Sequence, residues 1–297
     1  MFRGVLAGLA AGALWGLVFV APRMVPGFAA VDLAAGRFVV YGLVAFAVML
    51  AGLRTRRLPT LRQAGAAAAM SLLGFTGYYL LLVLAIRDAG TEVPTLVIGT
   101  IPLWVMLLGK PRHLRWSALV PGIALTAAGL GLMMVSHGGG ATGDGAADFG
   151  RGIAFAVASL ACWTAFALLN SAWLKRHPEV AATAWANWLG VATGLGGLVL
   201  WLVAGTGARS LVAQEQGRLF VLLCVATGFG SAWLATILWN IASQRLPASL
   251  CGQLIVSETL FALLYSFAWD GRWPTLSQSA ACLLFTLGIL ASVKAHR

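Results

Sequence analysis

Long unbroken apolar runs are the feature that most restricts how this 297-residue chain can fold. Counted between charged or Pro- and Gly-rich breaks, they give ten segments, near residues 4–21, 29–53, 64–86, 91–109, 116–136, 150–174, 180–204, 218–243, 247–268 and 275–293. Each is close to the roughly 20 residues that an α-helix needs to cross a bilayer. The strands of a membrane barrel would instead alternate apolar and polar residues over about 10 positions. The runs therefore predict an all-α integral membrane protein with ten transmembrane helices.

The composition agrees with a chain that is surrounded by lipid. Apolar residues make up 60% of it and charged residues only 10%, whereas about 25% of the residues in a soluble domain are charged. A soluble globule could not keep so much apolar surface in water. Soluble enzymes, nucleic-acid binders and disordered proteins are therefore excluded, and the lipid bilayer is the expected partner.

The distribution of basic residues predicts an orientation. With the N-terminus in the cytoplasm, the cytoplasmic segments hold 13 of the 20 Lys and Arg residues, and the outer segments hold six. Short loops rich in Lys and Arg stay on the cytoplasmic side. Both termini are therefore predicted to be cytoplasmic. The net charge of +11 is an orientation signal and does not indicate a nucleic-acid partner.

The longest connection between predicted spans is polar and Gly-rich, and it divides the chain into two halves. We expect a first five-helix repeat over residues 1–136, a periplasmic linker over 137–149 and a second five-helix repeat over 150–297. Because each half has an odd number of spans, a shared fold would place the second half upside down. Trp15 and Trp163 lie in mid-span at matching places in the two halves. The pattern predicts inverted repeats around a central cavity near the membrane midplane.

Several short motifs resemble the EamA-type transporters of the drug/metabolite transporter superfamily. They are GALWG at residues 12–16 with the following FVAP, the mid-span Arg37 and the arginine near the end of the third span, together with the ten spans in two halves. The stretch Gly90–Val93 (GTEV), with Pro102 further along, resembles the aromatic amino acid exporters of the YddG type. These resemblances imply an inner (plasma) membrane protein. It would export amino acids, aromatic or other neutral ones, or related metabolites by alternating access.

Other functions stay open at this point. A broad-specificity drug/metabolite or nucleoside-type exporter of the same superfamily is the main alternative. A membrane enzyme would need clustered His, Asp or Glu at one membrane face, and a channel would favour rings of polar residues. The chain has no P-loop of the form GxxxxGK[ST], so ATP is not expected to drive transport directly. We expect a small-molecule substrate, a monomer, and no catalytic residue, cofactor or metal site.

Glu258 is the sharpest single feature, because it lies near the middle of the ninth predicted span. A carboxylate at that depth is costly and usually faces a cavity or a partner. It is predicted to bind a substrate ammonium group or to carry a proton, and a structural hydrogen bond is the alternative. Gln253 and Ser257, four residues apart on one helix face, extend the predicted cavity-facing stripe. Arg37 is interpreted as reaching the outer interface with its long side chain. Pairing with a substrate carboxylate or with an acid such as Asp32 is the alternative.

Aromatic and amide side chains deep in the spans make up the rest of the predicted cavity. Aromatic rings can enclose an apolar substrate side chain, and an amide can serve either end of an amino acid. The predicted cavity residues are Trp15, Tyr78, Tyr79, Trp163, Asn187, Trp188, Gln253, Ser257 and Glu258. Packing against other helices or lipid is the alternative for each of them. Pro94 and Pro102 are predicted to bend the fourth span as part of a gate.

Overall fold

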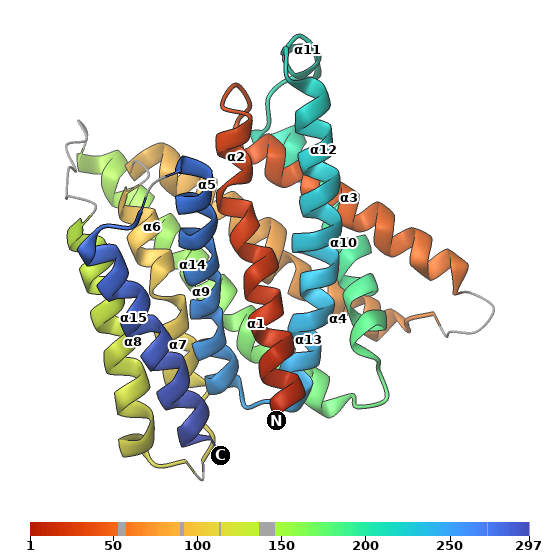
Figure 1. Ribbon diagram of the computed structural model, residues 1–297. Coiled ribbons are helices and arrows are strands. Elements are labelled where there is room, and N and C mark those ends of the chain that lie inside the picture. Colours follow the sequence, from red (N-terminus) through yellow and green to blue (C-terminus); the bar gives the residue numbers. More distant parts are fainter. Residues whose placement is uncertain (53–57, 90–91, 113, 137–145, 272, 297) are drawn as a thin grey trace.

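The computed structural model describes residues 1–52, 58–89, 92–112, 114–136, 146–271 and 273–296, and these ranges contain helices and no strands. Figure 1 shows a helical bundle with both termini at its lower end. Over the same ranges, eight helical stretches are long and apolar enough to cross a membrane. Two shorter apolar helices, Val97–Leu108 and Trp116–Leu132, fall within the fourth and fifth predicted spans. The all-helical class is confirmed for the described ranges, and the number of ten spans stays a prediction.

The first half of the chain forms its helices close to the predicted bounds. They are α1 (Phe2–Gly16), η1 (Leu17–Phe19), α2 (Ala21–Met24), α3 (Ala30–Ala51), α4 (Leu61–Ser71), η2 (Leu72–Thr76), α5 (Gly77–Ala89), α6 (Glu92–Gly99), α7 (Ile101–Leu108) and α8 (Trp116–Ser136). The fourth predicted span is interrupted at Thr100, between α6 and α7. Pro102 is the second residue of α7, where a missing backbone N–H costs little. Pro94 lies in the first turn of α6.

The second half has the same kind of helices. They are α9 (Ala146–Arg176), α10 (Ala182–Ala204), α11 (Ala208–Val212), α12 (Gly217–Thr227), η3 (Gly228–Leu234), α13 (Ala235–Arg245), α14 (Ala248–Asp270) and α15 (Leu276–Ala295). Of the predicted linker 137–149, residues 137–145 lie outside the described part of the chain. Residues 146–149 already belong to α9 and are not linker, consistent with a start on two alanines, which are the best helix formers.

The third and eighth predicted spans share an unusual interruption. The stretch α4–η2–α5 and the stretch α12–η3–α13 each cover 29 residues. In each, a π-helical segment follows the first 11 residues. π-Helical turns are rare and occur mostly as single insertions within α-helices, often at functional sites. Spans at corresponding places in the two halves therefore carry a matching backbone irregularity.

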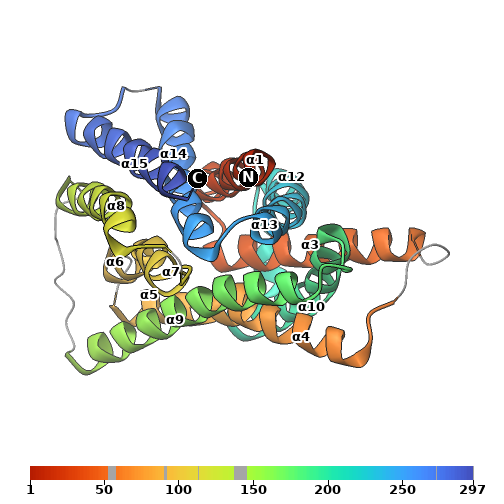
Figure 2. The same cartoon turned by 90° about the horizontal axis from the view of Figure 1, so that it is seen from below.

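Glycines let α1 approach α13 and α14 closely. A Cβ atom added at Gly8 would lie 2.6 Å from Cδ1 of Leu254, and one added at Gly12 would lie 2.1 Å from Oγ of Ser257. Gly4 and Gly16 continue the same close face, every fourth residue along the helix. Small residues at helix crossings allow such backbone approach in membranes. Figure 2 shows α1 beside α13 and α14.

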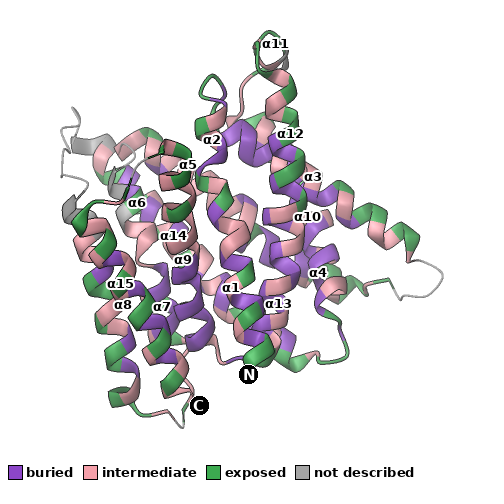
Figure 3. Cartoon of the chain, in the orientation of Figure 1, coloured by how far each residue is buried: buried purple, intermediate pink, exposed green. Residues whose placement is uncertain are grey.

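A second close crossing joins α3 to α10. A Cβ atom added at Gly42 would lie 2.6 Å from Cα of Gly194, and one added at Gly194 would lie 2.7 Å from Cα of Gly42. Gly42 is twelve residues after Ala30, where α3 begins, and Gly194 is twelve residues after Ala182, where α10 begins. A contact between equivalently placed residues is what a two-fold axis produces. Figure 3 shows buried residues along both helices.

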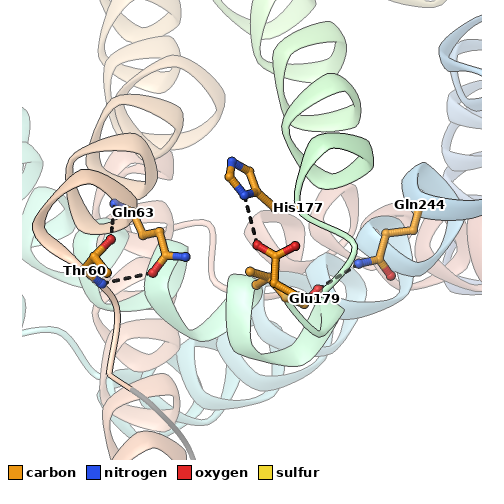
Figure 4. Close-up of polar contacts among 6 residues, drawn as sticks. Thr60, Gln63, His177, Glu179 and Gln244 are labelled. Atoms are coloured by element: carbon orange, nitrogen blue, oxygen red, sulfur yellow. Dashed lines mark hydrogen bonds and ion pairs between the residues drawn. The ribbon is translucent and has the colours of Figure 1, made fainter.

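Polar contacts fix the connections at the two ends of the bundle. Figure 4 shows Thr60 and Gln63, which form a capping box at the start of α4, and His177, whose ring nitrogen lies 3.0 Å from a carboxylate oxygen of Glu179. At the opposite end, Arg23 of α2 forms an ion pair with Asp270 of α14.

Candidate functional site

Three tryptophans from three helices meet inside the bundle. The ring centroid of Trp15 (α1) lies 6.5 Å from that of Trp163 (α9) and 5.3 Å from that of Trp239 (α13). The Trp163 and Trp239 centroids are 6.3 Å apart. Trp239 is fully enclosed, whereas Trp15 and Trp163 are partly exposed. Edge-on and tilted arrangements of this kind are among those that aromatic ring pairs prefer. We call these three residues the tryptophan cluster.

The sequence predicted two of the three members of the tryptophan cluster. Trp15 and Trp163 were singled out because they lie at matching places in the two halves, and their rings touch in the structure. Trp239 was not among the predicted cavity residues. The sequence places Trp239 deep in the eighth span, but it has no matching tryptophan in the first half that would single it out. Phe166 adds a further ring, with its centroid 6.0 Å from that of Trp163.

Two opposite charges lie on α3 and α14. Glu258 is the eleventh of the 23 residues of α14, and it interacts electrostatically with Arg37 of α3. Both charges also interact with Tyr78, which packs in the same hydrophobic cluster as the three tryptophans. Arg37 therefore points into the bundle, and our interpretation that it reaches the outer interface is wrong. Its position one to two turns inside α3 could not reveal this direction.

Arg37 and Glu258 do not touch. Within the described part of the chain, neither side chain forms a hydrogen bond or an ion pair. The Nε atom of Arg37 is enclosed and has no hydrogen-bond partner. The guanidinium carbon lies 4.9 Å from the centre of the Phe38 ring. The two charges thus interact electrostatically without the direct pairing that buried charges normally have.

Tyr78 and Tyr79 lie in the first turn of α5, just beyond the π-helical segment η2, and have different surroundings. Tyr78 packs towards the tryptophan cluster, and its backbone carbonyl accepts a 3.0 Å hydrogen bond from Ser159 of α9. The hydroxyl of Tyr79 donates to the carbonyl of Ala30 at 3.3 Å, and its ring is edge-on to Phe38. Tyr78 therefore belongs with the tryptophan cluster, whereas Tyr79 reaches the first residue of α3 and interacts electrostatically with Arg37.

Gln253 and Ser257 lie in helix packing contacts. The Gln253 amide donates to Oγ1 of Thr126 at 2.9 Å and accepts from Oγ of Ser292 at 3.0 Å, so it ties α14 to α8 and α15. The Ser257 hydroxyl donates to the carbonyl of Leu254 at 2.7 Å and faces Gly12 of α1. Both side chains are almost completely buried. Gln253 and Ser257 do not form one cavity-facing stripe with Glu258, because different faces of α14 pack against different helices. Neither Gln253 nor Ser257 is therefore part of the candidate site.

Replacing Gln253 by Leu gives a direct check of this placement. The change keeps a similar volume but leaves the hydroxyls of Thr126 and Ser292 without their partner. Unpaired buried polar groups cost about 1–3 kcal/mol each. We expect a clearly lower melting temperature in detergent and an unchanged ratio of transport rates between different substrates. A changed ratio in folded protein would put Gln253 back into the binding site.

Asn187 and Trp188 also lie away from the tryptophan cluster. The Asn187 side-chain oxygen accepts a 2.8 Å hydrogen bond from the indole of Trp233, which joins α10 to η3. The Trp188 ring is edge-on to Trp185, in the packing between α4, α9 and α10. Asn187 and Trp188 therefore hold helices together, which is the alternative to a role in the cavity.

The interrupted fourth span borders the site. Ile101 and Val105, in α7, are buried in the same hydrophobic cluster as Trp239. Pro102 lies between them, just after the break at Thr100. Pro94 is buried at the start of α6. The break beside Pro102 is therefore better placed to act as a gate than the first turn that contains Pro94.

The described ranges contain no group of three or more His, Cys, Asp or Glu residues that could hold a metal ion. Within the same ranges, Nε1 of Trp239 in the tryptophan cluster is enclosed and has no hydrogen-bond partner. Enclosed polar atoms without a partner are rare in folded proteins. The candidate site thus includes a hydrogen-bond donor as well as rings.

Comparisons with known proteins agree with the helical membrane architecture. The model of the EamA-like transporter family matches residues 2–136. The inner membrane protein YtfF of Escherichia coli (strain K12) is 35% identical over 311 aligned positions, which cover 99% of this chain and 96% of that protein. A protein with a solved crystal structure shares the fold with a TM-score of 0.78, at 21% identity and over 98% of both chains.

Proposed function

The chain belongs to the EamA-like transporter family and is a multi-pass inner-membrane protein, and from this premise we propose that it exports neutral amino acids, above all aromatic ones. The observation that carries the substrate class is the tryptophan cluster of Trp15, Trp163 and Trp239. An aromatic side chain among these rings would gain from burial and from edge contacts of about 0.5–1.5 kcal/mol per ring pair. The transported substrate would be a small molecule carried by a monomer.

We further propose that residues 1–136 and the segment from about residue 146 to 297 are inverted repeats. The matching π-helical segments η2 and η3 support this arrangement. The contact between Gly42 and Gly194 supports it independently, because both lie twelve residues into equivalent helices. In inverted-repeat transporters the substrate site lies between the repeats near the midplane. Alternating access would then rock one half against the other around the tryptophan cluster, with both termini in the cytoplasm.

The interrupted span α6–α7 is the proposed gate in the first half. A helix that is already broken at Thr100 can change the angle between its two parts without losing further backbone hydrogen bonds. Because Ile101 and Val105 are buried in the same hydrophobic cluster as Trp239, such a movement would change access to the tryptophan cluster.

Export from intact cells tests the proposed function. Cells fed with an alanyl-phenylalanine dipeptide accumulate phenylalanine, and its appearance in the medium measures export. We expect faster release from cells that overproduce this protein than from cells with an empty vector. The variant Trp163→Ala, produced to the same level, should release phenylalanine at the rate of the empty-vector cells. Equal release from all three strains would argue against phenylalanine as a substrate.

A further inference from the structure

The arrangement of Arg37 and Glu258 is unusual for two charges inside a membrane protein. They come from different halves of the chain, on α3 and α14, and they interact electrostatically. A charge within the membrane is costly and normally pairs with a neighbour of opposite sign. Within the described residues, however, neither side chain has a direct polar partner, and Nε of Arg37 is enclosed and unpartnered. Within the described residues, the two charges are therefore not neutralised by a direct contact with each other, and Arg37 keeps an enclosed donor without a partner.

A ligand that carries both signs on a short framework would satisfy both residues at once. A guanidinium binds a carboxylate through two parallel N–H donors, and Arg37 has an unused donor at Nε. A carboxylate such as that of Glu258 binds an ammonium group in the same charge-assisted way. An α-amino acid in its zwitterionic form has these two groups on one carbon atom. A plain amine or a plain carboxylic acid would leave one of the two protein charges unpaired.

We propose that Arg37 and Glu258 bind the two ends of a zwitterionic amino acid, the carboxylate on Arg37 and the ammonium group on Glu258. The proposal deepens the proposed function and rests on it, because it assigns the part of the substrate that all α-amino acids share. Tyr78 interacts with both charges and packs in the same hydrophobic cluster as Trp15, Trp163 and Trp239. It thus connects the charged end of the site to the tryptophan cluster, where the substrate side chain would lie.

The placement on two halves adds a consequence for transport. A substrate held by Arg37 of the first half and Glu258 of the second half bridges the two halves directly. The binding energy of such a substrate can then draw the two halves together. Only a ligand that carries both charges can supply this energy. Amino acids would be distinguished from amines and acids by this two-sided contact, and the rings would distinguish among amino acids.

Competition in proteoliposomes tests the assignment. Counterflow of labelled phenylalanine is measured against unlabelled phenylalanine, 2-phenylethylamine, which lacks the carboxylate, and 3-phenylpropionate, which lacks the ammonium group. In the wild-type protein both analogues should compete at least about tenfold more weakly than phenylalanine, because each loses one charge-assisted contact. An analogue that competes as well as phenylalanine would overturn the proposal, and this comparison needs no variant.

Two variants assign the contacts to their residues. In Arg37→Gln, phenylalanine should compete at least about tenfold more weakly than in the wild-type protein, whereas 2-phenylethylamine should be unaffected. In Glu258→Gln, phenylalanine should again lose affinity, whereas 3-phenylpropionate should be unaffected. Arg209→Gln and Glu215→Gln, exposed between α10 and α12, are the matched controls and should behave as wild type.

The pattern across the analogues separates this proposal from the proposed function. If neither variant changes competition by phenylalanine, or if each weakens all three competitors equally, the two-ended contact is wrong while amino acid transport stands. If the wild-type protein does not exchange phenylalanine or any other neutral amino acid, the proposed function fails and the assignment fails with it.

Discussion

Replacing Gly42 by Ala should lower the stability of this protein more than the other substitutions proposed here. The added Cβ would lie 2.6 Å from Cα and 3.2 Å from the backbone nitrogen of Gly194. Backbone atoms cannot rotate away as a side chain can, so α3 and α10 would have to separate. Overpacking of this kind costs about 1–3 kcal/mol, and sometimes more. We expect a melting temperature in detergent that is several degrees lower, and a reduced yield of monodisperse protein.

Gly65→Ala is the matched control for this prediction. Gly65 lies in the interior of α4, is exposed, and has no heavy atom within 4 Å of an added Cβ. Ala is a better helix former than Gly by about 1 kcal/mol, so this variant should be as stable as the wild type or more stable. Equal melting temperatures for the Gly42→Ala and Gly65→Ala variants would contradict the close approach of α3 and α10 at Gly42 and Gly194.

Trp163→Ala should have the second largest effect, on transport. The substitution removes a ring that contacts Trp15, Trp239 and Phe166. Loss of buried apolar contact and of ring contacts with an aromatic substrate together amounts to roughly 2–4 kcal/mol. Phenylalanine counterflow should therefore fall about tenfold or more. Trp163→Phe keeps a ring at this place and should retain an intermediate rate.

Trp104→Ala is the control for the effect of losing a tryptophan. Trp104 lies in α7, and 46% of its surface is exposed. Exposed substitutions usually change free energies by less than about 0.5 kcal/mol, so its transport rate should stay within about twofold of wild type. Similar losses in the Trp104 and Trp163 variants would mean that the tryptophan cluster has no special part in binding the substrate.

The helices could be predicted well because a membrane span is recognisable in the sequence as a long apolar run. The predicted span 29–53 compares with Ala30–Ala51 for α3, and the predicted span 247–268 compares with Ala248–Asp270 for α14. The π-helical segments could not be predicted, because the shift in hydrogen bonding within an apolar helix leaves no sequence pattern that we can recognise.

The candidate site could be predicted in part. Matching positions in the two halves placed Trp15 near Trp163, and depth in a span singled out Glu258. The sequence could not say which face of α14 meets which helix. Gln253 is therefore buried against α8 and α15, although it shares a span with Glu258. The direction of Arg37 likewise depends on how α3 crosses the bundle, which no local pattern specifies.

The most direct test of the account is counterflow by the purified protein in proteoliposomes with labelled phenylalanine, tryptophan, threonine and glutamate. We expect rapid exchange of phenylalanine and tryptophan, and slower exchange of threonine, which has no ring to place among Trp15, Trp163 and Trp239. We expect no exchange of glutamate, because its charged side chain would have to leave water for a site lined by these rings. No uptake of any neutral amino acid would contradict the account.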